Sequence, residues 1–290
     1  MLYPKTIDPT DADIAKLTQI YKTTYKTIVK EISTATDWGV ANRKQILAQV
    51  DRELEKLGVD VNDFLAKELP KYYKEGASDA IYQLENIDAG IDVSTGFNKL
   101  HNQAIQALVS ETSTAFGETL SGVSRSANKL LGKITRDMIT QKMAEGMVGG
   151  KALRDTRLAI KGILQEDGLT ALIDKGGREW SLDRYAEMLY RTKTVETRNR
   201  GIANRLVENN YDLVQVSNHG ASACEACQEW QGKILSLTGD TKGYPTIAEA
   251  EADGLFHPNC RHAINVLVPS LASRTKAYDP DSKTEIIDQP

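Results

Sequence analysis

The sequence is poor in aromatic residues and contains no long apolar run. Aromatic residues make up 6% of its 290 residues and hydrophobic residues 40%, so we expect a soluble protein with a mainly aliphatic core. No stretch approaches the ~18 apolar residues that identify a transmembrane helix. The first eight residues also lack the basic and apolar regions of a signal peptide. We therefore expect a protein that is made in a cytoplasm and has no membrane span.

The chain also lacks an excess of positive charge. It has 36 lysines and arginines against 40 aspartates and glutamates, a formal net charge of -4. Binding to phosphate depends on Lys and Arg. The slight excess of acidic residues therefore argues against a protein that binds nucleic acid over its whole surface. It leaves room for a local basic patch.

Apolar residues recur with helical spacing through the first half of the chain. From residue 11 to about residue 35 they fall at steps of three and four, which predicts an amphipathic helix. A second helix should follow an N-cap at Thr36-Asp37 and break near Gly58. Further helices are expected over 61–85, 96–115 and 126–147, with Gly76 as one of the interruptions. Residues 1–165 should therefore form a helical assembly domain, whose apolar stripes pack on one another.

The pattern changes after residue 177. Ser181 is a natural N-cap for a helix that should run to about Asn209. Short apolar or alternating segments at 213–216, 234–237 and 264–268 predict strands. The expected fold class is mainly α, a helical N-terminal array followed by a small α+β zinc-stabilised C-terminal domain at 166–272. Residues 273–290 are expected to form a flexible tail.

Cysteine is scarce, and all of it lies in the predicted α+β domain. The sequence has three cysteines and four histidines, and six of these seven residues lie between 219 and 262: His219, Cys224, Cys227, His257, Cys260 and His262. Zinc prefers four tetrahedral sulfur and nitrogen ligands, and a two-residue gap lets one turn present two of them. Cys224-x-x-Cys227 and His257-x-x-Cys260 both have that gap. These four residues form the preferred structural zinc site, with His262 as the alternative fourth ligand and His219 as the third choice.

Three other interpretations of these residues were weighed. The cysteines can be small buried apolar residues, although the matched spacing on both sides of the connection disfavours this. A redox Cys-x-x-Cys requires a helix N-terminus and a βαβ context, which residues 222–227 do not offer. The zinc deaminase signature needs His-x-Glu and a proline before the first cysteine, and His219-Gly220-Ala221 and Ala223 do not match it.

Five segments together resemble the minor capsid protein family of tailed bacteriophages, which is related to the Mu F-type head morphogenesis proteins. They are the runs at 180–192 (WSLDRYAEMLYRT), 216–220 (VSNHG), 224–227 (CEAC), 230–233 (WQGK) and 255–262 (LFHPNCRH). The last of these is the most specific. Relatives in the broader group often have cysteine at the position of His262, which keeps His262 open as a ligand.

The resemblance implies a low-copy structural protein of the virion rather than an enzyme. It would lie in the phage head near the portal vertex, contact the portal protein and other head proteins, and act in head assembly or genome delivery. The alternative is a zinc-containing nuclease, or another enzyme acting on nucleic acid, carried in the virion with His219 or His262 as general base. A host zinc-module adaptor is a third hypothesis.

A basic segment precedes the predicted metal site. The side chains proposed to contact packaged double-stranded DNA or the portal are Arg191, Lys193, Arg198 and Arg200. A solvated helix surface explains the same charges.

Overall fold

A computed structural model describes residues 9–34, 40–87, 93–145, 170–173, 179–220, 223–267, 277–279 and 284–286. The chain divides into two compact units, and neither is continuous in sequence. One unit comprises Asp11–Leu65 and Glu111–Glu187, and the other comprises Met1–Thr10, Ala66–Ser110 and Met188–Pro290. The expected domain boundary at residue 165 lies outside the described residues and stays a prediction.

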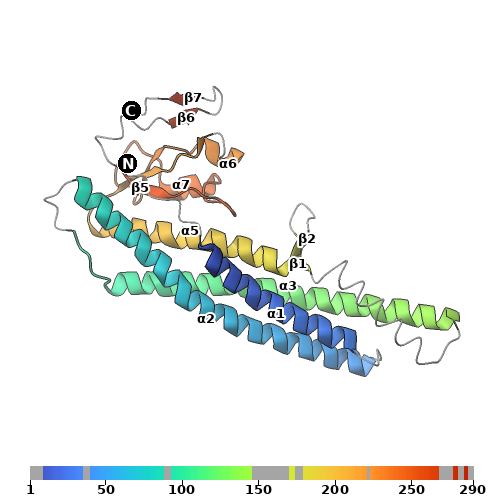
Figure 1. Ribbon diagram of the computed structural model, residues 1–290. Helices are drawn as coiled ribbons and strands as arrows, with labels where there is room; N and C mark the ends of the chain where they lie inside the picture. Colours follow the sequence, from blue (N-terminus) through green and yellow to red (C-terminus); the bar gives the residue numbers. More distant parts are fainter. Residues whose placement is uncertain are drawn as a thin grey trace. The chain divides into compact units, whose positions relative to one another are not determined.

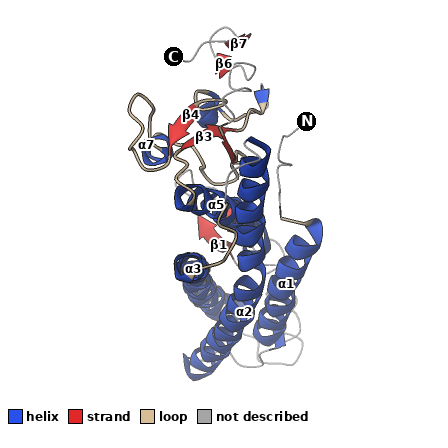
Figure 2. Ribbon diagram, turned by 90° about the vertical axis from the view of Figure 1, so that its left-hand side faces the viewer, coloured by secondary structure: helices blue, strands red, loops and turns tan. Residues whose placement is uncertain are grey.

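The first unit is a packing of long helices. Helix α1 (Asp11–Thr34) lies beside the first part of α2 (Val40–Ile87), as both ribbon views show (Figures 1 and 2). The later part of α3 (Lys99–Glu145) contributes Phe116, whose ring lies 6.4 Å from that of Tyr21 in α1. The apolar stripe predicted for α1 is buried, with Leu17 and Ile28 fully enclosed. Periodicity therefore identified the core-facing side of this helix correctly.

Helices α2 and α3 have fewer breaks than expected. Helix α2 continues through Gly58, and α3 replaces the two shorter helices expected at 96–115 and 126–147. Pro70 lies inside the helix expected at 61–85, and α2 continues through it as well. A glycine inside a helix costs only about 1 kcal/mol relative to alanine. Burial of Leu57 and Val61 on either side of Gly58 outweighs that cost.

Gly76 is a crossing point between helices instead of a break. It lies in α2, where a Cβ atom would clash with the backbone carbonyl of Arg198 in α5 (Leu182–Glu208). A Cβ atom at Gly201 of α5 would in turn clash with the carbonyl of Tyr73. The two glycines thus let the backbones of α2 and α5 approach directly, within the second unit.

A small antiparallel sheet packs on these two helices. Its strand order is β4 (Ile234–Ser236), β3 (Leu213–Val216) and β5 (Ile264–Val266), which agrees with the three predicted strands. The short helix α6 (Glu225–Gln228) follows β3, and α7 (Ile247–Ala252) lies beside β4 (Figure 2). One core joins α2, α5 and the sheet, and its buried members include Ala80, Leu84, Ile202, Leu206, Val214, Cys227, Trp230, Leu255, Cys260 and Ile264.

Side-chain amides from the helices close the outer edge of β5. Asn199 of α5 accepts from the backbone N–H of Ile264 at 3.3 Å and donates to the carbonyl of His262 at 3.4 Å. Gln83 of α2 accepts from the N–H of Val266 at 2.9 Å. Both amides are buried, so they replace a neighbouring strand and satisfy backbone groups that would otherwise lack partners.

The remaining strands form two separate pairs. Strand β1 (Thr170–Ile173) pairs with β2 (Glu179–Ser181), which was not predicted, and β6 (Ala277–Asp279) pairs with β7 (Thr284–Ile286). The last pair is the described part of the expected tail, and the rest of that tail lies outside the described residues. Among the described helices, none has both the length and the apolarity needed to cross a bilayer. The protein is mainly helical with a small sheet, as expected.

Candidate metal centre

Two tight turns carry four of the predicted donors. Cys224 occupies the N-cap position of α6, and the N–H of Cys227 donates to its carbonyl at 3.0 Å. The second turn repeats this arrangement, because the N–H of Cys260 donates to the carbonyl of His257 at 2.8 Å. Asn259 closes that turn with a positive φ of 65°, which asparagine tolerates better than most residues. The matched two-residue gaps in the sequence thus correspond to matched turns in the structure.

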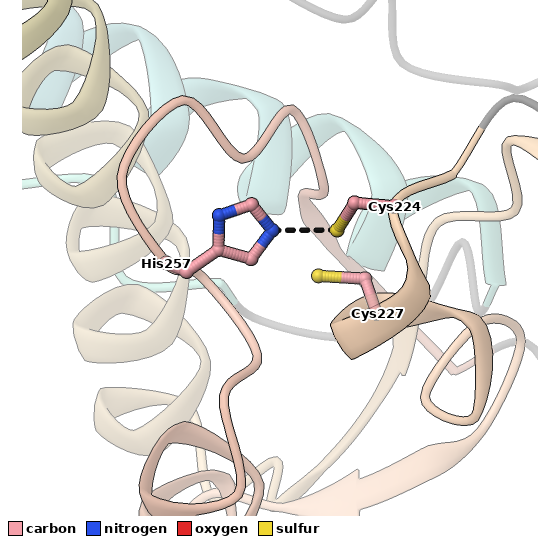
Figure 3. Close-up of side chains that lie close together, drawn as sticks. All are labelled: Cys224, Cys227 and His257. Atoms are coloured by element: carbon pink, nitrogen blue, oxygen red, sulfur yellow. Dashed lines mark hydrogen bonds between the residues drawn. The ribbon is translucent and has the colours of Figure 1, made fainter. Parts of the chain in front are cut away.

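The side chains of these turns point toward one another (Figure 3). Cys224 Sγ lies 2.6 Å from His257 Nε2, and Cys227 Sγ lies 3.6 Å from Cys260 Sγ. The donors form two groups whose atoms all lie within 4.8 Å of one another: Cys224, Cys227 and His257 in one, Cys227, Cys260 and His262 in the other. Cys227 is shared, so five side chains converge and could hold a metal ion.

The ring of His257 is oriented by its own loop. Its Nδ1 lies 2.8 Å from the carbonyl oxygen of Pro258, and since a carbonyl can only accept, Nδ1 carries the proton. Nε2 then has a free lone pair directed at Cys224. Metal-binding histidines are typically held in this way, with the distal nitrogen donating to a carbonyl or carboxylate.

Burial disfavours charge on three side chains of this cluster. It raises the pKa of the Cys227 thiol, and the nearby Cys260 and Cys224 raise it further. Burial likewise raises the pKa of Cys260. For His262, burial and the neighbouring His219 and His257 lower the pKa to about 4. A bound cation would offset these effects, because it stabilises thiolates and binds neutral imidazole.

Helix α5 supports the loop that carries His257 and Cys260. The hydroxyl of Thr192 accepts from the N–H of Asn259 at 3.0 Å, and seven residues later Asn199 holds the backbone around His262. Sequence reasoning missed both roles. The available signal was a pair of polar residues two helical turns apart, but their partners lie more than sixty positions away in the chain.

Apolar side chains surround the two buried thiols, Cys227 and Cys260. Trp230 and Leu255 belong to the same buried core as these cysteines, and Phe256 packs against it. The indole N–H of Trp230 donates to Asp253 at 3.0 Å, which satisfies its one polar atom. These two thiols are therefore largely closed to water, whereas Cys224 is exposed.

His219 lies beside the cluster and outside both donor groups. Its ring centroid is 4.5 Å from that of His262, its Nε2 lies 3.1 Å from Ser217 Oγ, and its backbone N–H donates to Gln231. His262 is 3% exposed. A general base must reach the proton that it removes, so this degree of burial makes His262 unsuitable for a nuclease reaction.

The redox interpretation also remains disfavoured. Cys224 does stand at a helix N-terminus, contrary to expectation, although α6 has only four residues. The sheet beside it is antiparallel and so provides no βαβ unit at this position.

The basic residues of α5 are only partly on the surface. Arg198 is 2% exposed and pairs with Asp79 at 2.5 Å, so it is a structural residue and not a surface contact. Lys193 pairs with Glu196 at 2.7 Å, Arg191 is half-buried, and Arg200 is exposed. Burial thus corrects the prediction for Arg198, and the contacts of the other three stay predictions.

The comparisons with known proteins agree on one kind of protein. Residues 14–288 match the family described as "Phage minor capsid protein 2". A relative named "Structural protein", from Lactococcus phage LL-H, is 26% identical over 251 residues, which are 78% of this chain and 67% of the relative. No solved structure matches the chain significantly.

Proposed function

The chain belongs to the phage minor capsid protein 2 family, and from this we propose that it is a low-copy virion protein acting near the portal vertex in head assembly or genome delivery. The family and the phage relative identify a structural capsid protein and not an enzyme. Other head proteins are therefore its expected partners. We also propose the portal protein and packaged double-stranded DNA as specific partners, with Arg191, Lys193 and Arg200 as candidate contacts.

We further propose that its C-terminal unit is stabilised by one structural zinc ion. The observation that supports this is the pair of facing turns: Cys224, Cys227 and the free Nε2 of His257 form one donor group, and Cys260 Sγ lies 3.6 Å from the shared Cys227 Sγ. Sulfur and nitrogen donors in this number fit tetrahedral zinc. The proposed ligands are Cys224, Cys227, His257 and Cys260.

Zinc would contribute folding free energy where the sequence provides few apolar anchors. A structural zinc ion contributes on the order of 10 kcal/mol when it binds. The long connection between the two turns, residues 231–256, has only one six-residue helix and a three-residue strand. Joining both ends of this connection through one ion would fix the loop on the core formed by α2 and α5.

The virion role is tested by quantitative mass spectrometry of purified particles, followed by cross-linking within them. We expect the protein at a small fraction of the molar amount of the major capsid protein, with cross-links to the portal. Absence from the particle, or an amount equal to that of the major capsid protein, would contradict the proposal. Zinc content per chain, measured on the purified protein, tests the metal site separately.

The alternative of a zinc nuclease carried in the virion is not favoured. Its two candidate bases are His262, which is buried, and His219, which makes contacts with Ser217 and His262. Incubating the zinc-loaded protein with double-stranded DNA should therefore give no cleavage.

A further inference from the structure

His262 differs from His257 in how its two ring nitrogens are placed. Its Nδ1 lies 3.3 Å from Cys260 Sγ, and its backbone nitrogen lies 3.4 Å from the same sulfur. Its Nε2 is buried and has no hydrogen-bond partner in the part of the chain that the structure describes. The one sulfur of Cys260 thus receives both nitrogen contacts of this residue, while the far side of the ring has none.

We propose that His262 is a positioning residue for the metal centre: it donates Nδ1–H and its backbone N–H to the thiolate of Cys260 and does not bind the ion. This inference rests on the zinc site proposed above and assigns a role to its fifth donor. The ion then has four ligands, and His262 determines the orientation and basicity of one of them.

The placement of the protons favours this assignment. If Nδ1 of His262 bound the metal, the ring proton would sit on Nε2, as a buried N–H with no acceptor. Such an unpaired buried donor costs about 1–3 kcal/mol and is rare in proteins. If Nδ1 carries the proton, it has an acceptor in Cys260, and Nε2 keeps only an unused lone pair.

His257 shows the opposite arrangement. The carbonyl of Pro258 accepts its Nδ1 proton, and its Nε2 is directed at Cys224. This is how a ligating imidazole is normally oriented. Of the two histidines, only His257 has its second nitrogen satisfied in the way that binding through the first requires.

Two N–H groups on one thiolate also have a chemical consequence. A hydrogen bond to the charged form of a group stabilises that form, so in a zinc-bound centre the two donors would share the negative charge of the Cys260 sulfur with the ion. The donors further restrict the direction of the Sγ lone pairs. Removing such outer contacts typically weakens metal binding about 10–100-fold without changing the ligands.

Cobalt substitution distinguishes the two roles, because the visible spectrum of Co²⁺ reports the number of sulfur and nitrogen ligands. The samples are the wild type, His262→Asn, His262→Ala and, as the matched control, His257→Asn. Asparagine keeps an N–H donor near the position of Nδ1 and provides no imidazole. We expect His262→Asn to bind one Co²⁺ with the wild-type spectrum, and His262→Ala to do so with roughly 10–100-fold lower affinity. His257→Asn should change the spectrum.

Several results would overturn the inference. A changed spectrum in His262→Asn with an unchanged one in His257→Asn would make His262 the ligand. Wild-type affinity in His262→Ala would remove its positioning role. If the wild type binds no Co²⁺ and no Zn²⁺, the zinc proposal fails first, and this role fails with it.

A measurement on the wild type avoids any effect of the variants on folding. With ¹¹³Cd bound and the histidines labelled with ¹⁵N, scalar coupling to cadmium should appear at Nε2 of His257. His262 should show a protonated Nδ1 and no coupling. Coupling at either nitrogen of His262 would refute the proposal.

Discussion

At the residue scale, Asp212 is the clearest case of a carboxylate that the fold needs in its charged form. It follows α5, and it accepts hydrogen bonds from the hydroxyls of Ser236 and Thr238 and from the N–H groups of Thr238 and Thr241. Burial works against the charge, but these donors prevail and hold the pKa of Asp212 well below its usual 3.8. One side chain thereby organises the turn after β4.

Asp212 should make folding stability depend on acid pH. A lowered pKa in the folded state means that the stabilisation is fully present above the unfolded pKa of about 3.8 and is lost as pH falls below it. We expect Asp212→Asn to lower the free energy of unfolding by about 1–3 kcal/mol at pH 7. The difference from wild type should shrink as the pH falls from 5 toward 2, and urea unfolding at each pH measures it. A difference that stays constant over this range would show that the charge of Asp212 contributes nothing.

Single residues also show where sequence reasoning about the site stops. Equal two-residue gaps predicted the facing pairs of donors, because a gap of that length is a local property of a turn. The choice between His257 and His262 was not accessible in the same way. It depends on whether the second ring nitrogen has a hydrogen-bond partner. His257 Nδ1 has the carbonyl of Pro258, His262 Nε2 has no partner among the described residues, and packing determines this difference.

At the scale of elements, the α2–α5 crossing depends on two glycines, of which Gly76 was expected to interrupt a helix. Gly76 and Gly201 each face a backbone carbonyl of the opposite helix. Added Cβ atoms would have to push the helices apart, because neither carbonyl can move independently of its helix. Glycine therefore permits close packing of two helices here, although it is usually unfavourable within a helix.

Substitution of Gly76 by alanine should destabilise the protein despite the better helix propensity of alanine. Overpacking of this kind typically costs about 1–3 kcal/mol. Gly117→Ala in α3 is the matched control, since a Cβ atom there meets nothing within 4 Å. It should gain up to about 1 kcal/mol. Thermal unfolding of both variants should give shifts of opposite sign, and a stabilised Gly76→Ala would show that the crossing is not tight.

The elements themselves were predictable wherever a local signal determined them. Ser181 and the apolar stripe beyond it placed α5 within a residue of its observed ends. Alternation placed β3 and β5, and a short apolar segment placed β4. The continuity of α2 was missed at Gly58, because the local cost of this glycine is smaller than the stabilisation gained by burying the neighbouring turns. The closing of β5 by Asn199 and Gln83 was missed because each amide meets a strand from a distant part of the chain.

At the scale of the whole molecule, the predicted metal centre belongs to a unit assembled from distant segments. That unit contains Ala66–Ser110 as well as Met188–Pro290. Ala80 and Leu84 of α2 share a core with Cys227 and Cys260. Metal binding should therefore stabilise a helix that lies about 140 residues earlier in the sequence, and not only the loops that hold the ion.

Hydrogen exchange measures this coupling directly. The zinc-loaded protein is compared with Cys227→Ser and with the wild type after chelation. In these two metal-free samples, amides of α2 at 77–87 and of α5 at 199–206 should lose protection by at least about tenfold, or ~1.4 kcal/mol. Amides of α1 at 14–32 are the internal control and should change little, because their core residues belong to the other unit. If protection falls only within 223–262, the ion stabilises its own loops alone. A loss in α2 and α5 together would show that the metal holds the sheet and the crossing helices as one cooperative unit, which is what a structural ion in a shared core requires.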